Sequence, residues 1–437
     1  MNEIVSNLLV YGSLPEDSIL WQLADICEKL KNQTESKDAL RGRVFHQVKN
    51  LLTVATDYAF DKNLWHNYLT FLLITNENPF SLVCEKMGAQ DGTVNNFVTH
   101  DFEMFKKLFD YDFSWMEKEL SIDCFTQLTH YKAIRKKELM YNKNVSEKVR
   151  NLSEQLETAE SGVDFFKYVT EFYKDFGVGM FGLNKAFRIA ENGDGSVRFL
   201  PINNMDAVML DDLIGYELQK KKLVENTQAF CDGKAANNVL LFGDSGTGKS
   251  TSIKAIVNQF YPQGLRMIEI YKHQFKDLST IIAQIKNRNY KFIIYMDDLS
   301  FEEFEIEYKF LKAVIEGGVE TKPDNVLIYA TSNRRHLIKE TWKDREDMEH
   351  SEDLHRSDTM EEKLSLVNRF GLSIYYAKPN KEGFNEMAIA LARRAGITPD
   401  IMTDEEICYE ANRFEMRGGG LSGRTAQQFA NYLLTIK

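Results

Sequence analysis

The chain has 437 residues, of which 43% are hydrophobic and 27% charged, as in a folded globular protein, and its length predicts two or three domains. A formal net charge of -11 argues against nonspecific coating of nucleic acid, although it leaves a local basic groove open. The sequence shows no apolar run as long as a membrane span, no basic start of a signal peptide and no metal-binding cysteine spacing, so we expect a cytoplasmic protein without membrane contact.

Residues 1–200 follow a helical pattern, with apolar residues recurring three and four positions apart. Aromatic side chains are dense here, and a stripe of this kind is more often packed core than a ligand platform. The aromatic residues behind this prediction are Trp21, Trp65, Phe71, Phe97, Phe102, Phe105, Phe109 and Trp115. A basic patch, interpreted as a solvated helix face, consists of Lys132, Arg135, Lys136 and Lys137. We predict a mainly α-helical N-terminal domain over 1–200, whose role the pattern does not reveal.

Glycines interrupt the helical pattern over 177–206, which predicts a small hairpin or linker at the domain boundary. Strands then alternate with helices, which implies a parallel sheet with both faces covered. The first predicted strand begins at Val239, and the later strands are predicted over 265–271, 291–296, 326–330 and 372–376. One predicted helix ends at Phe230, and the later helices are predicted over 251–260, 277–286, 302–316, 383–395, 403–416 and 424–436. The polar, acidic segment 343–363 is interpreted as a mobile surface insertion.

A glycine-rich turn after the first of these strands has the pattern of a phosphate-binding loop, G-x-x-x-x-G-K-[ST]. Glycines let backbone N–H groups converge on phosphate oxygens, and the helix that follows points its positive end at the same anion. The lysine would reach the β- and γ-phosphates, and the serine hydroxyl would hold Mg²⁺. The loop consists of Gly243, Asp244, Ser245, Gly246, Thr247, Gly248, Lys249, Ser250 and Thr251.

Polar residues at the ends of later strands are the candidates for chemistry, because ligands bind at the carboxyl ends of parallel strands. Asp297 would hold Mg²⁺, usually through water, and Asp298 would polarise the attacking water, unless it is a turn or cap residue. Asn333 would bind the γ-phosphate or that water, with a helix cap or Asx-turn as the alternative. Arg369 and Arg424 could neutralise phosphate charge, but residue type alone does not separate them from Arg334, Arg335 or Arg417.

The motifs from Val208 to Lys437 resemble the AAA+ ATPases, an oligomeric branch of the P-loop NTPases. Ile214 and Gly215, in Asp-Leu-Ile-Gly-Tyr, resemble the element that cradles adenine. The loop at Gly243 resembles Walker A, and 292–298 resembles Walker B. Asn333 resembles sensor 1, Arg369 the arginine finger supplied to a neighbouring subunit, and Arg424 sensor 2. The resemblance implies an α/β P-loop fold of AAA+ type over 201–378, a C-terminal helical lid over 379–437, ATP and Mg²⁺ as cofactors, and a homo-oligomer with its arginine finger acting in trans.

A closer resemblance is to an uncharacterised bacterial AAA+ family, described as ATP-binding proteins with a domain of unknown function. Its marks are Asp-Asp-Leu-Ser-Phe-Glu-Glu from Asp297, Thr-Ser-Asn-Arg-Arg-His-Leu from Thr331 and Glu-Glu-Lys-Leu-Ser-Leu from Glu361. AAA+ proteins usually end Walker B with Asp-Glu, whereas this chain has Asp297-Asp298. The second carboxylate is one methylene shorter, which bears on the rate of hydrolysis.

The leading hypothesis is an ATPase that hydrolyses Mg-ATP to drive conformational change in an unidentified macromolecular client. The alternative is an ATP-gated switch or loader that hydrolyses slowly and recruits a protein or DNA partner, although the net charge does not support nucleic acid. A third hypothesis, a small-molecule kinase, has the last helices as a closing lid. It is disfavoured by the large helical N-terminal half and the lack of a second-substrate motif.

Overall fold

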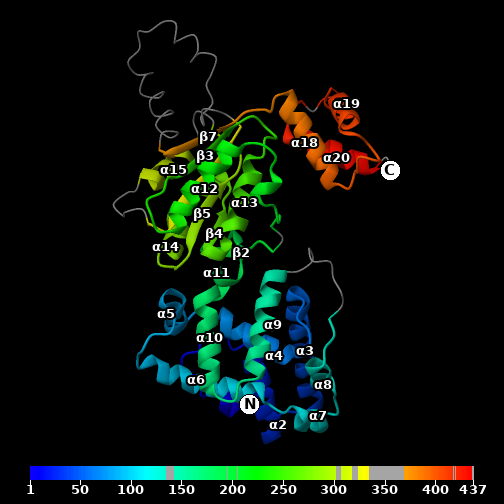
Figure 1. Ribbon diagram of the computed structural model, residues 1–437. Coiled ribbons are helices and arrows are strands. Elements are labelled where there is room, and N and C mark those ends of the chain that lie inside the picture. The colour runs from blue at the N-terminus through cyan, green and yellow to red at the C-terminus, as the bar shows by residue number, and fades with distance from the viewer. Residues whose placement is uncertain are drawn as a thin grey trace. The chain divides into compact units, whose positions relative to one another are not determined.

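The structure is a computed structural model whose contacts divide the chain into two compact units, Met1–Asn184 and Lys185–Lys437 (Figure 1). It describes residues 1–133, 142–193, 195–203, 205–301, 307–316, 323–333, 369–416, 418 and 420–435. Several sequence predictions lie outside these residues: the insertion at 343–363, the marks at 302–303, 334–337 and 361–366, and the arginines at 135, 334, 335 and 417.

The first unit is helical in its described residues, as the apolar spacing predicts. Side-chain caps begin several helices; Ser18, for example, accepts from the backbone N–H of Trp21, and Ser161 forms a capping box with Asp164. The helices are α1 (Asn2–Val5), α2 (Ile19–Asn32), α3 (Lys37–Tyr58), α4 (Leu64–Thr75), α5 (Pro79–Met87), α6 (Val94–Phe109), α7 (Ser114–Leu120), α8 (Cys124–Thr129), α9 (Lys143–Glu157), α10 (Gly162–Phe176) and α11 (Gly179–Leu183).

Most of the predicted aromatic core is present in this unit. Trp65, Phe102, Phe105 and Phe109 are buried in one cluster, and the other aromatic residues of the predicted stripe, except one, are partly buried against it. The exception is Phe97, which is 50% exposed, so its assignment to the core was wrong. Phe97 lies in the first turn of α6. The spacing of apolar residues along a helix does not show whether another part of the chain covers that side of the helix.

The second unit contains a seven-stranded sheet in the order β2-β1-β4-β5-β6-β3-β7. All neighbours pair in parallel except β1 and β2. Residues of the central strands are buried almost throughout, which is the pattern of strands covered on both faces. The strands are β1 (Ala186–Glu191), β2 (Val197–Pro201), β3 (Val239–Gly243), β4 (Leu265–Glu269), β5 (Lys291–Met296), β6 (Val326–Ser332) and β7 (Leu372–Tyr376).

The hairpin of β1 and β2 belongs to this sheet. Residues 186–188 pair in parallel with 267–269 of β4, so the hairpin extends the sheet at its edge. The predicted N-terminal domain extends to residue 200 and so includes most of this hairpin, whereas the second unit already begins at Lys185. Pairing with a strand about eighty residues further along is a non-local contact, which the glycine pattern around the hairpin cannot reveal. The division of the chain into three functional domains stays a prediction.

Helices α12 (Glu217–Cys231) and α13 (Lys249–Phe260) pack on one face of the sheet, where their apolar residues share a core with alternate residues of the strands. Among the described residues, the other helices around the sheet are α14 (Leu278–Ile285) and α15 (Glu307–Glu316), together with the 3₁₀ turns η2 (Leu210–Asp212), η3 (Tyr261–Gln263) and η4 (Lys272–Asp277). α13 begins at Lys249 rather than at the predicted 251, which places Lys249 and Ser250 in its first turn.

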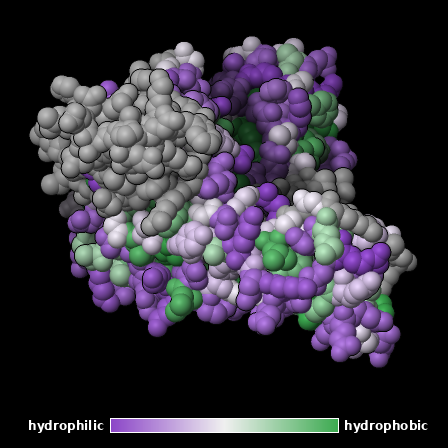
Figure 2. Space-filling model, turned by 90° about the horizontal axis from the view of Figure 1, so that it is seen from above, coloured by the Kyte–Doolittle hydropathy of each residue, from purple (hydrophilic) through white to green (hydrophobic). Residues whose placement is uncertain are grey.

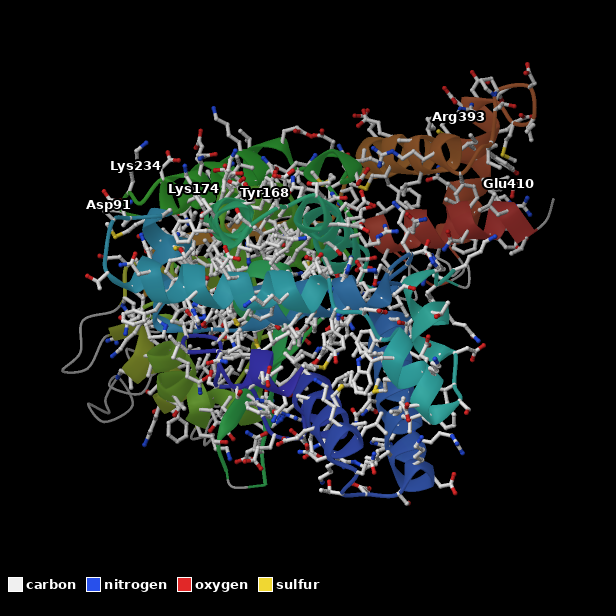
Figure 3. All side chains as sticks on the ribbon, turned by 90° about the horizontal axis from the view of Figure 1, so that it is seen from below. Asp91, Tyr168, Lys174, Lys234, Arg393 and Glu410 are labelled. Carbon is white, nitrogen blue, oxygen red and sulfur yellow. The ribbon has the colours of Figure 1, made fainter. Side chains whose placement is uncertain are left out.

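A small bundle of three helices ends the described chain, as predicted: α18 (Lys381–Arg394), α19 (Asp404–Glu415) and α20 (Gly423–Thr435) (Figure 1). They share an apolar core of their own. Arg393, labelled with Glu410 in Figure 3, ties α18 to α19: its guanidinium donates to the carbonyl oxygens of Ile397 (2.7 Å) and Met402 (3.0 Å) and pairs with Asp404.

Among the coloured residues in Figure 2, hydrophilic ones predominate, and the hydrophobic ones form small separate groups. Among the described helices, none is both long enough and apolar enough to cross a membrane.

Candidate functional site

A cavity of about 620 Å³ opens where the glycine-rich loop, the segment around Ile214 and the C-terminal bundle meet. Its volume lies within the range typical of ligand sites. It is lined by Asp212, Leu213, Ile214, Tyr216, Ser245, Gly246, Thr247, Gly248, Lys249, Ser250, Thr251, Asp297, Asp298, Thr331, Asn333, Met387, Leu391, Gly423, Arg424, Gln427 and Gln428. The structure thus brings most of the predicted site residues together. Gly215, Gly243, Asp244 and Arg369 are outside the lining.

The loop between β3 and α13 has the backbone expected of an anion-binding turn. Gly243, Gly246 and Gly248 have φ angles of 127°, 77° and 90°, which side chains rarely tolerate. A Cβ on Gly243 would lie 2.3 Å from the carbonyl oxygen of Tyr376, so β7 forbids any larger residue there. Gly248 caps α13 without a side-chain acceptor, which leaves the first N–H groups of the helix to an anion in the cavity.

Lys249 is 6% exposed and is held by three oxygen atoms. Its Nζ donates to the carbonyls of Gly243 (2.9 Å) and Asp244 (2.6 Å) and to Oδ1 of Asn333 (3.0 Å). Burial lowers the pKa of Lys249, and the carboxylates of Asp244, Asp298 and Asp297 offset part of this effect. The ammonium group is thus fixed at the carboxyl ends of β3 and β6.

Asp297 follows β5 directly, and one of its carboxylate oxygens accepts hydrogen bonds from three hydroxyl groups. Oδ1 accepts from Ser250 Oγ (2.7 Å), Tyr295 OH (2.7 Å) and Thr331 Oγ1 (2.6 Å). Partial burial acts to raise the pKa of Asp297, but the hydrogen bonds from Thr331, Ser250 and Tyr295 outweigh it and hold the pKa below its usual value. Asp297 is therefore ionised at neutral pH and is fixed against the first turn of α13.

Asp298 adopts a left-handed backbone conformation with φ 49°, which aspartate tolerates better than most residues. Its Oδ1 accepts from Nδ2 of Asn333 at 2.7 Å. Because Oδ1 of Asn333 also accepts from Lys249, a continuous chain of hydrogen bonds joins Lys249, Asn333 and Asp298. The end of β5, the end of β6 and the start of α13 meet in this chain.

The C-terminal bundle contacts the loop through the start of α20. The backbone N–H of Arg424 donates to the carbonyl oxygen of Gly246 (3.2 Å), and a Cβ on Gly246 would lie 3.1 Å from Oγ of Ser422 and 3.2 Å from Cβ of Arg424. The side chain of Arg424 lines the cavity. The phosphate-binding loop and the start of α20 are therefore in direct contact.

Arg369 lies at the other end of the sheet. It precedes β7, whose first residue pairs with Val239 and whose last residue pairs with Gly243. The first and last residues of a five-residue parallel strand lie about 13 Å apart, at roughly 3.3 Å per residue. Since Leu372 marks the end remote from the loop, Arg369 does not reach the cavity of its own chain.

The apolar side of the cavity contains residues that are not among the predicted site residues. Met387 and Leu391 of α18 line it beside Ile214, and Tyr216 lies against Tyr376 with ring centroids 5.1 Å apart. Gly215 supplies a turn with φ 78° beneath Met387 and does not face the cavity itself. No local signal marks Met387 or Leu391, because they are ordinary apolar positions of an amphipathic helix.

The oxygen atoms of this site fit Mg²⁺ bound together with phosphates. Within the described residues, no three His, Cys, Asp or Glu side chains form a metal cage. Mg²⁺ is usually held by one or two protein oxygens together with water and substrate phosphates. The Ser250 hydroxyl donates a hydrogen bond to Asp297, which leaves the lone pairs of Oγ for a cation. Ser250 and Asp297 would then hold the metal.

A parallel sheet with the strand sequence β4-β5-β6-β3-β7, a glycine-rich loop after β3 and a helical lid over that loop define a P-loop NTPase fold of AAA+ type. The chain belongs to the family DUF815, whose description is "Protein of unknown function" and whose profile matches residues 183–436. No curated protein matches the chain.

Solved structures with a similar fold include two mutants of RuvB from Thermotoga maritima and PCH-2 from C. elegans. The RuvB structures have identities of 18% and 16%, and TM-scores of 0.36 and 0.33. PCH-2 has an identity of 18% and a TM-score of 0.33. Each alignment covers 52% of this chain, and this chain covers 66% and 71% of the RuvB chains and 65% of PCH-2.

Proposed function

We propose that the chain binds Mg-ATP in this cavity and hydrolyses it, and that hydrolysis drives conformational change in a macromolecular client. The observation that supports this most directly is the hydrogen-bonded chain of Lys249, Asn333 and Asp298 beside the pair of Ser250 and Asp297. It brings together a cation for the phosphates, a metal site and a carboxylate for the attacking water.

The triphosphate would lie along the loop, with its β- and γ-phosphates against Lys249 and the N–H groups that begin α13. The adenine would lie between Ile214 and the apolar side chains of α18, Met387 and Leu391. Mg²⁺, when bound, supplies positive charge to the β- and γ-phosphate oxygens. Asp298 would orient a water molecule, which attacks the γ-phosphorus as the bond to the β–γ bridging oxygen breaks. The products are ADP and inorganic phosphate.

Coupling to a client would run through the lid, because the backbone of Arg424 is bonded to the loop at Gly246. Arg424 itself would contact the γ-phosphate. Departure of the phosphate removes negative charge from a site that includes this guanidinium, so the position of α20 would depend on the nucleotide state. Motion of α20 would then act on a bound client.

Wild-type protein is expected to hydrolyse ATP with Mg²⁺ and to lose turnover when EDTA removes the metal, because phosphoryl transfer needs charge neutralisation on the phosphate oxygens. Phosphate release with purified full-length chain measures this, and re-addition of Mg²⁺ should restore the rate. Protein that neither binds nor turns over ATP in the presence of Mg²⁺ contradicts the proposed function.

The remote position of Arg369 supports a homo-oligomer in which this residue serves the neighbouring site. Mixing inactive Arg369→Ala and Asp298→Asn proteins is therefore expected to restore part of the ATP turnover, because an intact Arg369 from one subunit can complete an intact Asp298 site in the next. Arginine fingers contribute about 10³- to 10⁵-fold to turnover, so the recovered rate should stand clear of either protein alone.

The matched control mixes Arg369→Ala with a chain that carries both substitutions, which has no intact Arg369 to offer. Recovery only in the first mixture supports action in trans. An Arg369→Ala protein with unchanged turnover contradicts the assignment of this residue.

The alternative is an ATP-gated switch or loader with slow hydrolysis that recruits a protein or DNA partner. The observation that favours it is the short carboxylate of Asp298, which is bonded to Asn333. A switch of this kind would bind Mg-ATP tightly and would keep the lid in one position until the partner arrives.

A further inference from the structure

We propose that Thr331 is a positioning residue that holds the two adjacent aspartates in different orientations, so that Asp297 faces the metal and Asp298 faces the attacking water. This inference rests on the proposed function, because it assigns the two carboxylates to parts of that reaction. It adds a residue that the phosphate loop and the strand-end acids do not include.

Two adjacent carboxylates at the end of a strand pose a geometric problem. Successive side chains of an extended strand point to opposite faces, so a regular continuation of β5 would turn Asp298 away from Asp297. Both nevertheless line the same cavity. The left-handed conformation of Asp298, with φ 49°, bends the chain immediately after β5 and makes this arrangement possible.

Thr331 bonds to every residue of this bend. Its Oγ1 donates to Oδ1 of Asp297 (2.6 Å) and accepts from the backbone N–H of Asp298 (2.9 Å). Its carbonyl oxygen accepts from the backbone N–H of Leu299 (2.7 Å). With 2% of its surface exposed, Thr331 forms these bonds away from bulk water, where a lost partner is costly.

The hydroxyl of Thr331 is the link between the two carboxylates. Tyr295 and Ser250 also donate to Oδ1 of Asp297, but of the two aspartates each hydroxyl bonds to Asp297 alone. Thr331 reaches Asp298 as well, through its backbone, and so orients the carboxylate that accepts from Asn333. Loss of this hydroxyl should disturb both carboxylates, whereas loss of the Tyr295 hydroxyl should disturb Asp297 alone.

Packing does not require threonine at this position. Valine has the same shape and an equal preference for strands, and β6 is buried along its whole length. The difference between the two residues is the hydroxyl, so Thr331→Val removes the proposed function of the side chain and retains its volume. Thr331→Ser retains the hydroxyl and removes only a methyl group.

The test compares these variants with Tyr295→Phe by two readouts. The first is the affinity for a fluorescent ATP analogue with Mg²⁺ and with EDTA, and the second is kcat and KM for hydrolysis. Thr331→Val is expected to lose about tenfold of the Mg²⁺-dependent gain in affinity, with affinity in EDTA unchanged, because one hydrogen bond to a charged group is removed. Its kcat should also fall by about tenfold or more, since Asp298 is released.

Thr331→Ser should match the wild type in both readouts. Tyr295→Phe should lose part of the Mg²⁺-dependent gain, with kcat at saturating Mg-ATP within about twofold of wild type. Thr227→Val is the matched control, because Thr227 is a buried threonine whose hydroxyl is 2.8 Å from that of Tyr329 and which is outside the lining of the cavity. It should leave both readouts unchanged.

The inference is overturned if Thr331→Val keeps the wild-type Mg²⁺ gain and kcat, or if Thr331→Val and Tyr295→Phe show the same profile. Thr331→Ala replaces Thr331→Val if the latter does not fold, and it is compared with Thr331→Ser by the same readouts. Wild-type protein without any Mg-ATP binding would instead contradict the proposed function, so the two failures are distinguishable.

Discussion

Lys249→Ala is expected to abolish ATP binding, with the fold retained. Nζ of Lys249 is the cation fixed between the loop and Asn333, and its removal leaves the β- and γ-phosphates without their main charge partner. Hydrogen bonds to charged groups contribute about 1.5–3 kcal/mol each, so the loss of two phosphate contacts corresponds to a fall in affinity of roughly a hundredfold or more. Isothermal titration calorimetry with Mg-ATP measures it.

Lys254→Ala provides the matched control. Lys254 lies on the same helix, α13, and pairs with Asp206 at 2.7 Å, outside the lining of the cavity. It should bind ATP as the wild type does. Thermal unfolding of both variants shows whether the fold is kept. If Lys249→Ala binds ATP with unchanged affinity, the phosphates do not lie against this loop and the proposed function fails.

Asp298→Asn is expected to stop hydrolysis while leaving ATP binding close to that of wild type. Asparagine has the shape of aspartate and is among the residues that tolerate a left-handed backbone, so the bend after β5 should persist. Its amide oxygen can still accept from Asn333, but it cannot take a proton from water. Loss of general-base assistance typically lowers turnover by about 10²- to 10⁴-fold. Steady-state phosphate release, measured beside analogue binding, separates the two effects.

Asp206→Asn is the corresponding control, because the carboxylate of Asp206 lies on the surface of the same unit in an ion pair with Lys254. Its turnover should equal that of wild type. Asp298→Asn also distinguishes the two proposed functions. Wild-type turnover slower than about one per minute that Asp298→Asn leaves unchanged would favour the ATP-gated switch.

The C-terminal lid contacts the phosphate loop directly. α20 begins against Gly246, and its Arg424 lines the cavity with Gln427 and Gln428. The lid and the phosphate loop therefore share one cavity wall. In the proposed function, a γ-phosphate bound to Lys249 would lie in the same cavity as Arg424, so its effect on α20 would need no long-range pathway.

Local patterns were sufficient to predict much of this site. The strands at Lys291–Met296 and Leu372–Tyr376 have the predicted bounds, because each is a short apolar run between polar or glycine-rich segments. The phosphate loop needed only its glycines, its lysine and the strand before it. The family resemblance added the order of the motifs and the AAA+ type. The family match over 183–436 confirms the resemblance to a family with a domain of unknown function.

Other features were beyond the reach of these patterns. The hydroxyl of Thr331 contacts Asp297 across 34 positions of sequence, and the amide of Asn333 contacts Lys249 across 84. Met387 and Leu391 lie in no recognisable sequence motif. The glycines around β1 and β2 predicted a small hairpin or linker, but they did not reveal that the hairpin pairs with β4, because that pairing is not local.

The sequence by itself determined the class of fold, the phosphate loop and the acids that follow the buried strand, since turn chemistry and apolar periodicity act between residues a few positions apart. Only the tertiary structure decided which hydroxyl groups orient Asp297, how Asp298 turns toward Asn333, and which end of the sheet carries Arg369. Those relations depend on the order and register of strands that are distant in the chain, and pairing of this kind is set by the packing of the whole unit.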